Sequence, residues 1–200
     1  MGKVILLDNG HGVNTPGKCS PDKSIREWSY SREIVKRIYR ELTNKGYDAR
    51  ILVPEDDDIK LSVRAGRANE VCKEVGAENV VLVSVHLNAA GNGSDWMKGR
   101  GWEVYSTKGK TNSDDLAQSI YDIAEKYLVP LGFKMRPDYS DGDADKEANF
   151  TLLYMANCPA VLTENLFQDN KEEVEFLLTE EGKQVITDIH VEGILNYINK

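Results

Sequence analysis

Short apolar runs that end in turn residues alternate along the chain with longer segments of helical periodicity. Lys3–Asp8, Asn79–His86 and Pro159–Glu164 are continuous apolar runs, which are typical of strands buried on both faces of a parallel sheet. Tyr47–Val53 has the composition of a further strand. Gly101–Thr107 alternates between apolar and polar side chains and is therefore predicted to be a more exposed strand.

Helical segments follow several of these strands. Ile25–Lys45 carries apolar side chains at helical spacing and ends before Gly46, a residue that favours the conformation found at helix C-termini. Leu61–Val75 and Ser113–Leu131 have similar periodicity, and Lys171–Lys200 supplies the closing helices. The alternation predicts an α/β fold, a three-layer sandwich in which helices flank a twisted, mostly parallel (mixed) sheet.

The composition is that of a globular protein, since 40% of the 200 residues are hydrophobic and 29% are charged. The apolar runs are far shorter than the roughly 18–20 residues that cross a bilayer, so we expect no membrane-spanning segment. Lys and Arg number 25 against 33 Asp and Glu, which gives a formal net charge of −8. Because such a field repels polyanions and anionic lipids, we expect no binding to nucleic acid or to membranes.

The cysteines and the N-terminus bear on where the protein is made. Cys19, Cys72 and Cys158 are widely spaced and form neither a disulfide framework nor a CxxC metal motif, so we expect buried, reduced thiols. Met1-Gly2-Lys3 leads directly into an apolar strand, without the cleavage pattern of a secretory signal. We therefore expect synthesis in the cytoplasm with no signal peptide.

Two of the three histidines lie at the ends of predicted strands. His11 follows the first strand and His86 closes the central one, whereas His190 falls within the last helix. Glu164 also ends a strand. Because active sites of open α/β sheets collect at the carboxyl ends of the strands, we expect His11, His86 and Glu164 to share one edge and His190 to be structural.

A divalent cation would compensate for a carboxylate at the end of an apolar strand, where an unpaired charge is costly to bury. Catalytic zinc commonly has three protein ligands and one open position. Glu27, in the first turn of the first predicted helix, is the candidate third ligand beside the two histidines. Two alternatives remain: Glu27 could be an acid that stabilises the helix N-terminus, and Glu164 could pair with Arg64 or Arg67.

Four blocks in order resemble the zinc-dependent N-acetylmuramoyl-L-alanine amidases of the type-3 group. They are LLDNGHG (6–12), REWSYSREI (26–34), SVHLNAAG (84–91) and PAVLTENLFQDN (159–170). These blocks are similar to the family's DxGHG opening, its helix-opening glutamate, its S-x-H-x-N-A block and its closing P-x-V-L-x-E block. Asn9 and Val13 depart from the proline and second glycine that are common in the family's first turn.

The resemblance implies a single catalytic amidase domain over residues 1–200 that binds one zinc ion through His11, Glu27 and His86. It implies hydrolysis of the amide between the lactyl group of N-acetylmuramic acid and L-alanine of the stem peptide in peptidoglycan. It further implies that water activated by zinc attacks the amide, with Glu164 as general base and then general acid. The alternatives are a zinc peptidase or deacylase acting on another amide, or a non-catalytic wall-binding module.

The same resemblance bears on partners and location. We expect a monomer whose partner is bacterial peptidoglycan. Because this substrate lies outside the cytoplasm and no signal is visible, a phage or prophage lysin that is released through the membrane fits the sequence.

Several polar residues near the blocks have two possible roles. Asn88 and Trp96 are candidates for substrate binding, but either residue could simply stabilise its loop. Asp8 is a candidate hydrogen-bond partner for a zinc-binding His11. The acidic segment Asp141–Asp145 lacks the glycine and glutamate of an EF-hand and is predicted to be a solvated loop.

Overall fold

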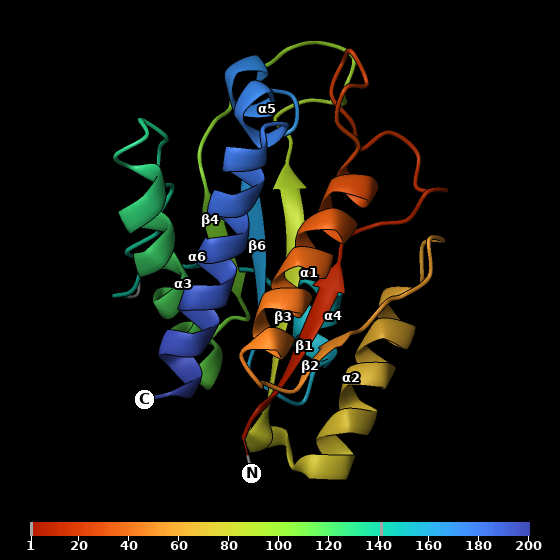
Figure 1. Cartoon of the computed structure of the whole chain (residues 1–200), viewed down its shortest axis with the longest axis vertical. Coiled ribbons are helices and arrows are strands. Elements are labelled where there is room, and N and C mark those ends of the chain that lie inside the picture. Colours follow the sequence, from red (N-terminus) through yellow and green to blue (C-terminus); the bar gives the residue numbers. More distant parts are fainter. Residues whose placement is uncertain (1, 141) are drawn as a thin grey trace.

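A mixed β-sheet of six strands, in the order β2-β1-β3-β6-β4-β5, runs through the centre of the computed structural model, which describes residues 2–140 and 142–200 (Figure 1). The strands are β1 (Val4–Asn9), β2 (Ala49–Ile51), β3 (Val80–Asn88), β4 (Glu103–Ser106), β5 (Lys146–Glu147) and β6 (Ala160–Phe167). Neighbouring strands are parallel except β4 and β6, which are antiparallel. The prediction of a mostly parallel, mixed sheet is confirmed.

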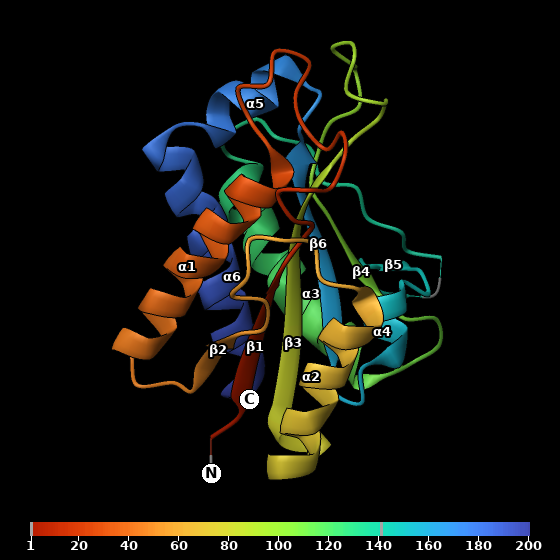
Figure 2. The ribbon, with the colours of Figure 1, turned by 90° about the vertical axis from the view of Figure 1, so that its right-hand side faces the viewer.

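Helices cover both faces of this sheet. They are α1 (Glu27–Asn44), α2 (Leu61–Val75), α3 (Asn112–Leu128), α4 (Thr151–Met155), α5 (Lys171–Leu177) and α6 (Glu180–Ile198), with one turn of 3₁₀ helix, η1, at Ala77–Asn79. Helices α1, α3 and α6 pack on one face, and α2 and α4 pack on the other (Figure 2). The three-layer sandwich is therefore as predicted.

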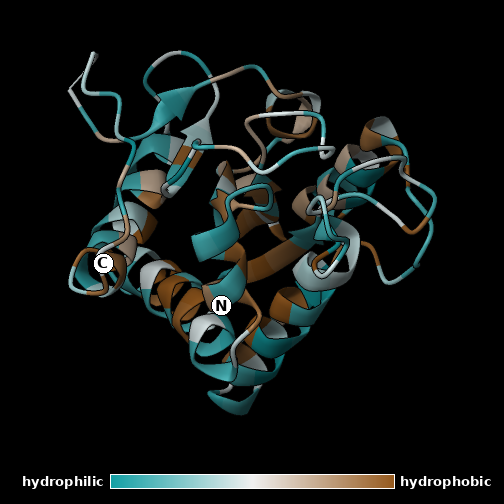
Figure 3. Ribbon diagram, turned by 90° about the horizontal axis from the view of Figure 1, so that it is seen from above, coloured by the Kyte–Doolittle hydropathy of each residue, from teal (hydrophilic) through white to brown (hydrophobic). Residues whose placement is uncertain are grey.

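The continuous apolar runs are explained by the two helical layers. In β1, Ile5 and Leu7 belong to the core beneath α1 and α6, whereas Val4 and Leu6 belong to the core beneath α2. Figure 3 shows hydrophobic strand segments in the interior, surrounded by helices that carry both hydrophobic and hydrophilic residues and by loops. Side chains of successive residues point to opposite faces of a strand, so a strand with two covered faces needs apolar residues throughout.

The strand predicted to be more exposed is in fact buried. Within Gly101–Thr107, Val104 packs against the apolar face of α3. Glu103, which breaks the apolar pattern, is only 3% exposed because ion pairs with Arg136 and Lys146 compensate its charge. The prediction of exposure is wrong because paired charges can be buried on a strand that alternates in sequence.

Some features match the sequence pattern and others do not. The bounds of α2 agree with the predicted Leu61–Val75, whereas β5 and α4 are too short to leave a periodic signal. Cys72 and Cys158 are buried free thiols as expected, but Cys19 is only half-buried. Among the described residues, no helix combines the length and the apolar character required to cross a membrane.

The register of the parallel strands brings polar residues together at one edge of the sheet. Asp8 of β1 lies opposite Ser84 of β3, and His86 of β3 lies opposite Glu164 of β6. This edge also receives the turn after β1 and the first turn of α1, so residues from five segments meet there.

Candidate metal centre

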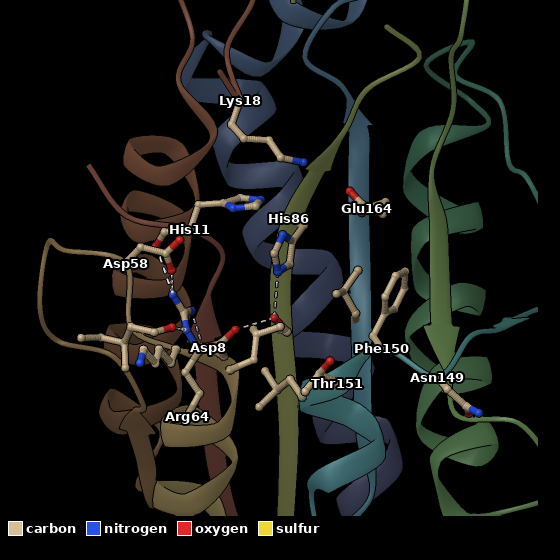
Figure 4. A pocket seen from close by; sticks show the side chains of 16 residues that line it. Asp8, His11, Lys18, Asp58, Arg64, His86, Asn149, Phe150, Thr151 and Glu164 are labelled. Atoms are coloured by element: carbon tan, nitrogen blue, oxygen red, sulfur yellow. Dashed lines mark hydrogen bonds and ion pairs between the residues drawn. The ribbon is translucent and has the colours of Figure 1, made fainter. Parts of the chain in front are cut away.

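His11 lies in the turn after β1 and has a left-handed backbone conformation, with φ of 60°. This conformation is unfavourable for a residue with a β-carbon, so surrounding contacts must hold it. Nη1 of Arg32 donates to the carbonyl oxygen of His11 at 3.0 Å, and Nη2 of Arg64 donates to the same oxygen at 3.3 Å. The two guanidinium groups fix the turn that presents the imidazole at the sheet edge, where Figure 4 shows His11 and Arg64.

Glu27 is the first residue of α1, and its side chain is only 1% exposed. Its Oε1 atom lies 3.0 Å from Nδ1 of His86 and 3.3 Å from Nε2 of His11. The backbone N–H of Leu87 donates to Oε1, and the side-chain amide of Gln168 donates to Oε2 at 2.9 Å. Glu27 is thus held in one orientation between the two histidines.

The three side chains have the arrangement of a metal site. Potential ligand atoms of His11, Glu27 and His86 all lie within 4.8 Å of one another, and no other such group of three occurs in residues 2–140 and 142–200. Imidazole nitrogens and a carboxylate oxygen are the donor set of many catalytic zinc ions. The residues present therefore fit a zinc ion, as the sequence predicted from the same three positions.

Charge pairing within the group favours this interpretation. Burial alone would raise the pKa of Glu27, but hydrogen bonds with His11 and His86 lower that pKa well below its usual range. Burial lowers the pKa of His86, but the adjacent Glu27 carboxylate raises it by more than burial lowers it. The pKa of His86 is therefore raised overall. Glu27 is therefore a carboxylate at neutral pH, in the state that binds a cation.

Glu164 lies beside this group without belonging to it. Its Oε2 atom is buried and has no hydrogen-bond partner among the described residues. Burial raises the pKa of Glu164 to about 8; the positive charge of His86 opposes this shift, and the negative charges of Glu27 and Glu103 reinforce it. A carboxyl group with a free oxygen and such a pKa can accept and release a proton.

A cavity of about 610 Å³ opens at the same edge. It is lined by His11, His86 and Glu164, and by Lys18, whose ammonium group points toward the space between His86 and Glu164 (Figure 4). Phe150 and other apolar side chains form a further part of the wall. The cavity can therefore hold a substrate with a polar reacting group and apolar surroundings.

The alternative pairing of Glu164 with an arginine is not observed. Arg64 forms an ion pair with Asp8, and Arg67 forms one with Glu55. Asp8 accepts hydrogen bonds from Arg64 and from Ser84 rather than from His11, so the expected Asp8–His11 contact is wrong. The reason is that Asp8 faces its register partner on β3, while His11 turns away after the strand ends.

Asn88 and Trp96 lie outside the lining of this cavity. The side-chain amide of Asn88 donates to Oε1 of Glu103 at 2.6 Å, which connects β3 to β4. Trp96 is 37% exposed in the loop between these strands. Their roles in substrate binding stay predictions.

The acidic segment is partly buried. Asp141 lies outside the described residues, but Asp145 is 1% exposed, and the backbone N–H of its neighbour Ala144 donates to Gln118 of α3. Burial and the adjacent Asp143 raise the pKa of Asp145 to about 7. The prediction of a solvated loop is therefore wrong for Asp145, because this part of the segment folds against α3.

Two residues of the site were not predicted from the sequence. Gln168 lies after a bulge in which Leu166 has a φ of 67°, and this turn directs its amide toward Glu27. Lys18 reaches the cavity from the loop that precedes α1. Gln168 lies within the last sequence block, which was the available signal, whereas Lys18 has no distinguishing local pattern.

Comparison with known proteins places the whole chain among cell-wall amidases. The family described as N-acetylmuramoyl-L-alanine amidase matches residues 5–196. The endolysin of Bacillus phage SPP1 is 30% identical over an alignment that covers 100% of this chain and 67% of the endolysin. For N-acetylmuramoyl-L-alanine amidase AmiC of Neisseria meningitidis the identity is 25%, and the alignment covers 98% of this chain but only 53% of that protein.

Solved structures agree with this similarity. The crystal structure of N-acetylmuramoyl-L-alanine amidase from Clostridium difficile 630 superposes with a TM-score of 0.82 at 28% identity and covers 100% of this chain and 98% of that chain. N-acetylmuramoyl-L-alanine amidase AmiC2 of Nostoc punctiforme superposes with a TM-score of 0.79 at 23% identity over 99% of both chains, and so shares the fold.

Proposed function

The chain belongs to the N-acetylmuramoyl-L-alanine amidase family, and from this premise we propose that it hydrolyses the amide bond that joins the lactyl group of N-acetylmuramic acid to L-alanine in peptidoglycan. The observation that carries the proposal is the meeting of His11, Glu27 and His86 beside Glu164, whose Oε2 is buried and has no hydrogen-bond partner within residues 2–140 and 142–200. Three ligands and a separate proton carrier are the parts that metal-assisted amide hydrolysis requires.

His11, Glu27 and His86 are the residues that hold one zinc ion per chain. The chemistry that zinc supplies when bound is that of a Lewis acid, which polarises the amide carbonyl and makes a water molecule easier to deprotonate. Glu27 contributes one negative charge to the site, and Gln168 keeps its second oxygen turned away from the histidines.

Glu164 moves the proton. Its carboxylate takes a proton from the attacking water as the new carbon–oxygen bond forms. The same carboxyl group then gives this proton to the amide nitrogen as the carbon–nitrogen bond breaks, so that L-alanine leaves as a free amine. Lys18, whose ammonium group faces the same space, stabilises the negative charge that develops on the carbonyl oxygen.

The substrate fixes the place of action. The endolysin and cell-wall amidases to which the chain is similar bear names that place their action on the bacterial cell wall. We propose that this protein likewise acts on the wall, as a monomer, after release from the cell in which it is made.

Digestion of purified peptidoglycan tests the proposal. The protein is incubated with the wall material, and the soluble products are identified by mass spectrometry. We expect stem peptides that begin with a free L-alanine and glycan chains that carry free lactyl groups. A chelator should stop the release, and added zinc should restore it. Cleavage within the stem peptide or between sugars would instead identify a peptidase or a glycosidase, and the absence of any product would indicate a binding module.

A further inference from the structure

A continuous hydrogen-bonded chain connects Arg64 to His86 through two buried side chains. Nη1 of Arg64 donates to Oδ1 of Asp8 at 2.8 Å. The hydroxyl of Ser84 donates to the other oxygen, Oδ2, at 2.5 Å. The same hydroxyl oxygen lies 3.1 Å from Nε2 of His86. Asp8, Arg64 and Ser84 are each at most 1% exposed, so solvent does not compete for these contacts.

The donors and acceptors of this chain fix the position of each hydrogen atom. A guanidinium group only donates, and Asp8 in an ion pair with it only accepts. Ser84 has one hydroxyl hydrogen and gives it to Asp8, so it can only accept from His86. In the neutral ring, the state that binds a metal ion, Nε2 of His86 must therefore carry the one hydrogen, which leaves Nδ1 with a free electron pair.

This tautomer matters because the opposite one would also find a partner. Nδ1 of His86 lies 3.0 Å from Oε1 of Glu27, so a hydrogen on Nδ1 would form a good hydrogen bond there. That hydrogen would occupy the position of a metal ion. The contact with Glu27 favours the tautomer that cannot bind metal through Nδ1, and the contact with Ser84 favours the tautomer that can.

We propose that Asp8 and Ser84, oriented by Arg64, are positioning residues that hold His86 in the Nε2–H tautomer and so present Nδ1 as its metal-binding atom. The inference rests on the proposed function, because it concerns the zinc ligands. Arg64 also donates to the carbonyl oxygens of Asn9 and His11, at 2.7 and 3.3 Å. One buried guanidinium thus supports both histidines of the site.

Two substitutions separate this role from simple packing. In Asp8→Asn, the side chain keeps its shape, and Arg64 attracts the amide oxygen, so the NH₂ group is left to donate to Ser84. Ser84 must then donate to Nε2 of His86, which moves the histidine hydrogen to Nδ1. We expect zinc affinity to fall by about 10–100-fold, as is common when the outer hydrogen bond of a metal-binding histidine is lost. Ser84→Ala removes the acceptor for Nε2 of His86 but does not replace it with a donor. We therefore expect a smaller fall in zinc affinity, of about tenfold.

Ser119→Ala is the matched control, because it also removes a buried hydroxyl, one that donates to the carbonyl of Gly193 between α3 and α6. Zinc affinity is measured by competition with a chelator, and folding by thermal unfolding of the metal-free proteins. The control should bind zinc as the parent does. If Asp8→Asn does not fold, the zinc affinity of Ser84→Ala is compared with that of Ser119→Ala alone.

The decisive readout is the position of the histidine hydrogen in the zinc-loaded parent, obtained from ¹⁵N NMR of the ring nitrogens. The chain has only three histidines, so assignment is direct. We expect Nε2 of His86 to carry hydrogen and Nδ1 to bind zinc. Zinc on Nε2, or parental affinity in both Asp8→Asn and Ser84→Ala, would overturn the proposal while leaving the proposed function intact. A parent that binds no zinc would overturn both.

Discussion

The backbone of Gly10 lies against the imidazole ring of His86, so that a Cβ on Gly10 would come within 2.3 Å of Cε1 and 2.4 Å of Nδ1. Any side chain at position 10 must therefore displace the ring. We expect Gly10→Ala to lower zinc affinity by at least about tenfold and to lower turnover with it, because displacement disrupts the metal-binding geometry. Zinc competition and hydrolysis of purified peptidoglycan check this expectation.

Gly66→Ala provides the control for Gly10→Ala. Gly66 lies within α2, and a Cβ there meets nothing within 4 Å. Alanine should stabilise this helix by about 0.5–1 kcal/mol and leave zinc binding unchanged. Equal zinc affinity in the two variants would show that the His86 ring keeps its metal-binding position even when residue 10 has a side chain.

Lys18→Ala separates substrate chemistry from metal binding. The ammonium group of Lys18 faces the space between His86 and Glu164 (Figure 4). Lys18 is not one of the three residues that could hold the metal. Its loss should reduce kcat/KM by about 10- to 100-fold, since a hydrogen bond that involves a charged group commonly contributes about 1.5–3 kcal/mol. Zinc affinity should stay at the parental value. A loss of zinc together with activity would assign Lys18 a structural role instead.

His190 should make stability depend on pH. Burial lowers the pKa of His190 from 6.5 to about 4, and the hydrogen bond with the carbonyl of Ile186 only partly opposes this shift. Between pH 6.5 and 4, His190 is therefore protonated in the unfolded state but neutral in the folded state. The free energy of unfolding consequently falls as the pH falls. The contribution reaches about 3 kcal/mol near pH 4, at 1.36 kcal/mol for each pH unit.

His190→Gln tests this contribution. The variant should be less stable than the parent at pH 7, because it loses packing and hydrogen bonds in the core. The difference should narrow as the pH falls toward 4, because glutamine does not titrate. Denaturant unfolding across this range measures both curves. If the free energies of unfolding of parent and variant changed in parallel with pH, the pKa of His190 would not be lowered in the folded state.

The sequence predicted the architecture because buried parallel strands leave an unambiguous pattern. Lys3–Asp8 and Asn79–His86 correspond to β1 and β3, and both are apolar throughout because helices cover both faces. β4 shows the limit of this reasoning. Its alternation reflects Glu103, whose charge is compensated by Arg136 and Lys146 from distant segments, and local sequence carries no sign of such pairing.

The residues that could hold a metal ion could be predicted to meet because strand ends converge in space. His11 and His86 follow from that rule, and Glu27 from its place at the start of α1. The contacts that orient them could not be predicted. The link from Asp8 to Ser84 depends on the register of β1 and β3, and the reach of Gln168 depends on a bulge in β6.

We propose that Glu164 carries the proton of a hydrolysis for which His11, Glu27 and His86 hold the metal, and one variant tests this most directly. Glu164→Gln keeps the shape of the side chain but cannot accept a proton. Zinc content and peptidoglycan hydrolysis are measured on the same preparation of this variant. We expect one zinc per chain, as in the parent, and turnover reduced by about 10²–10⁴-fold. Zinc-loaded Glu164→Gln with near-parental turnover would contradict it.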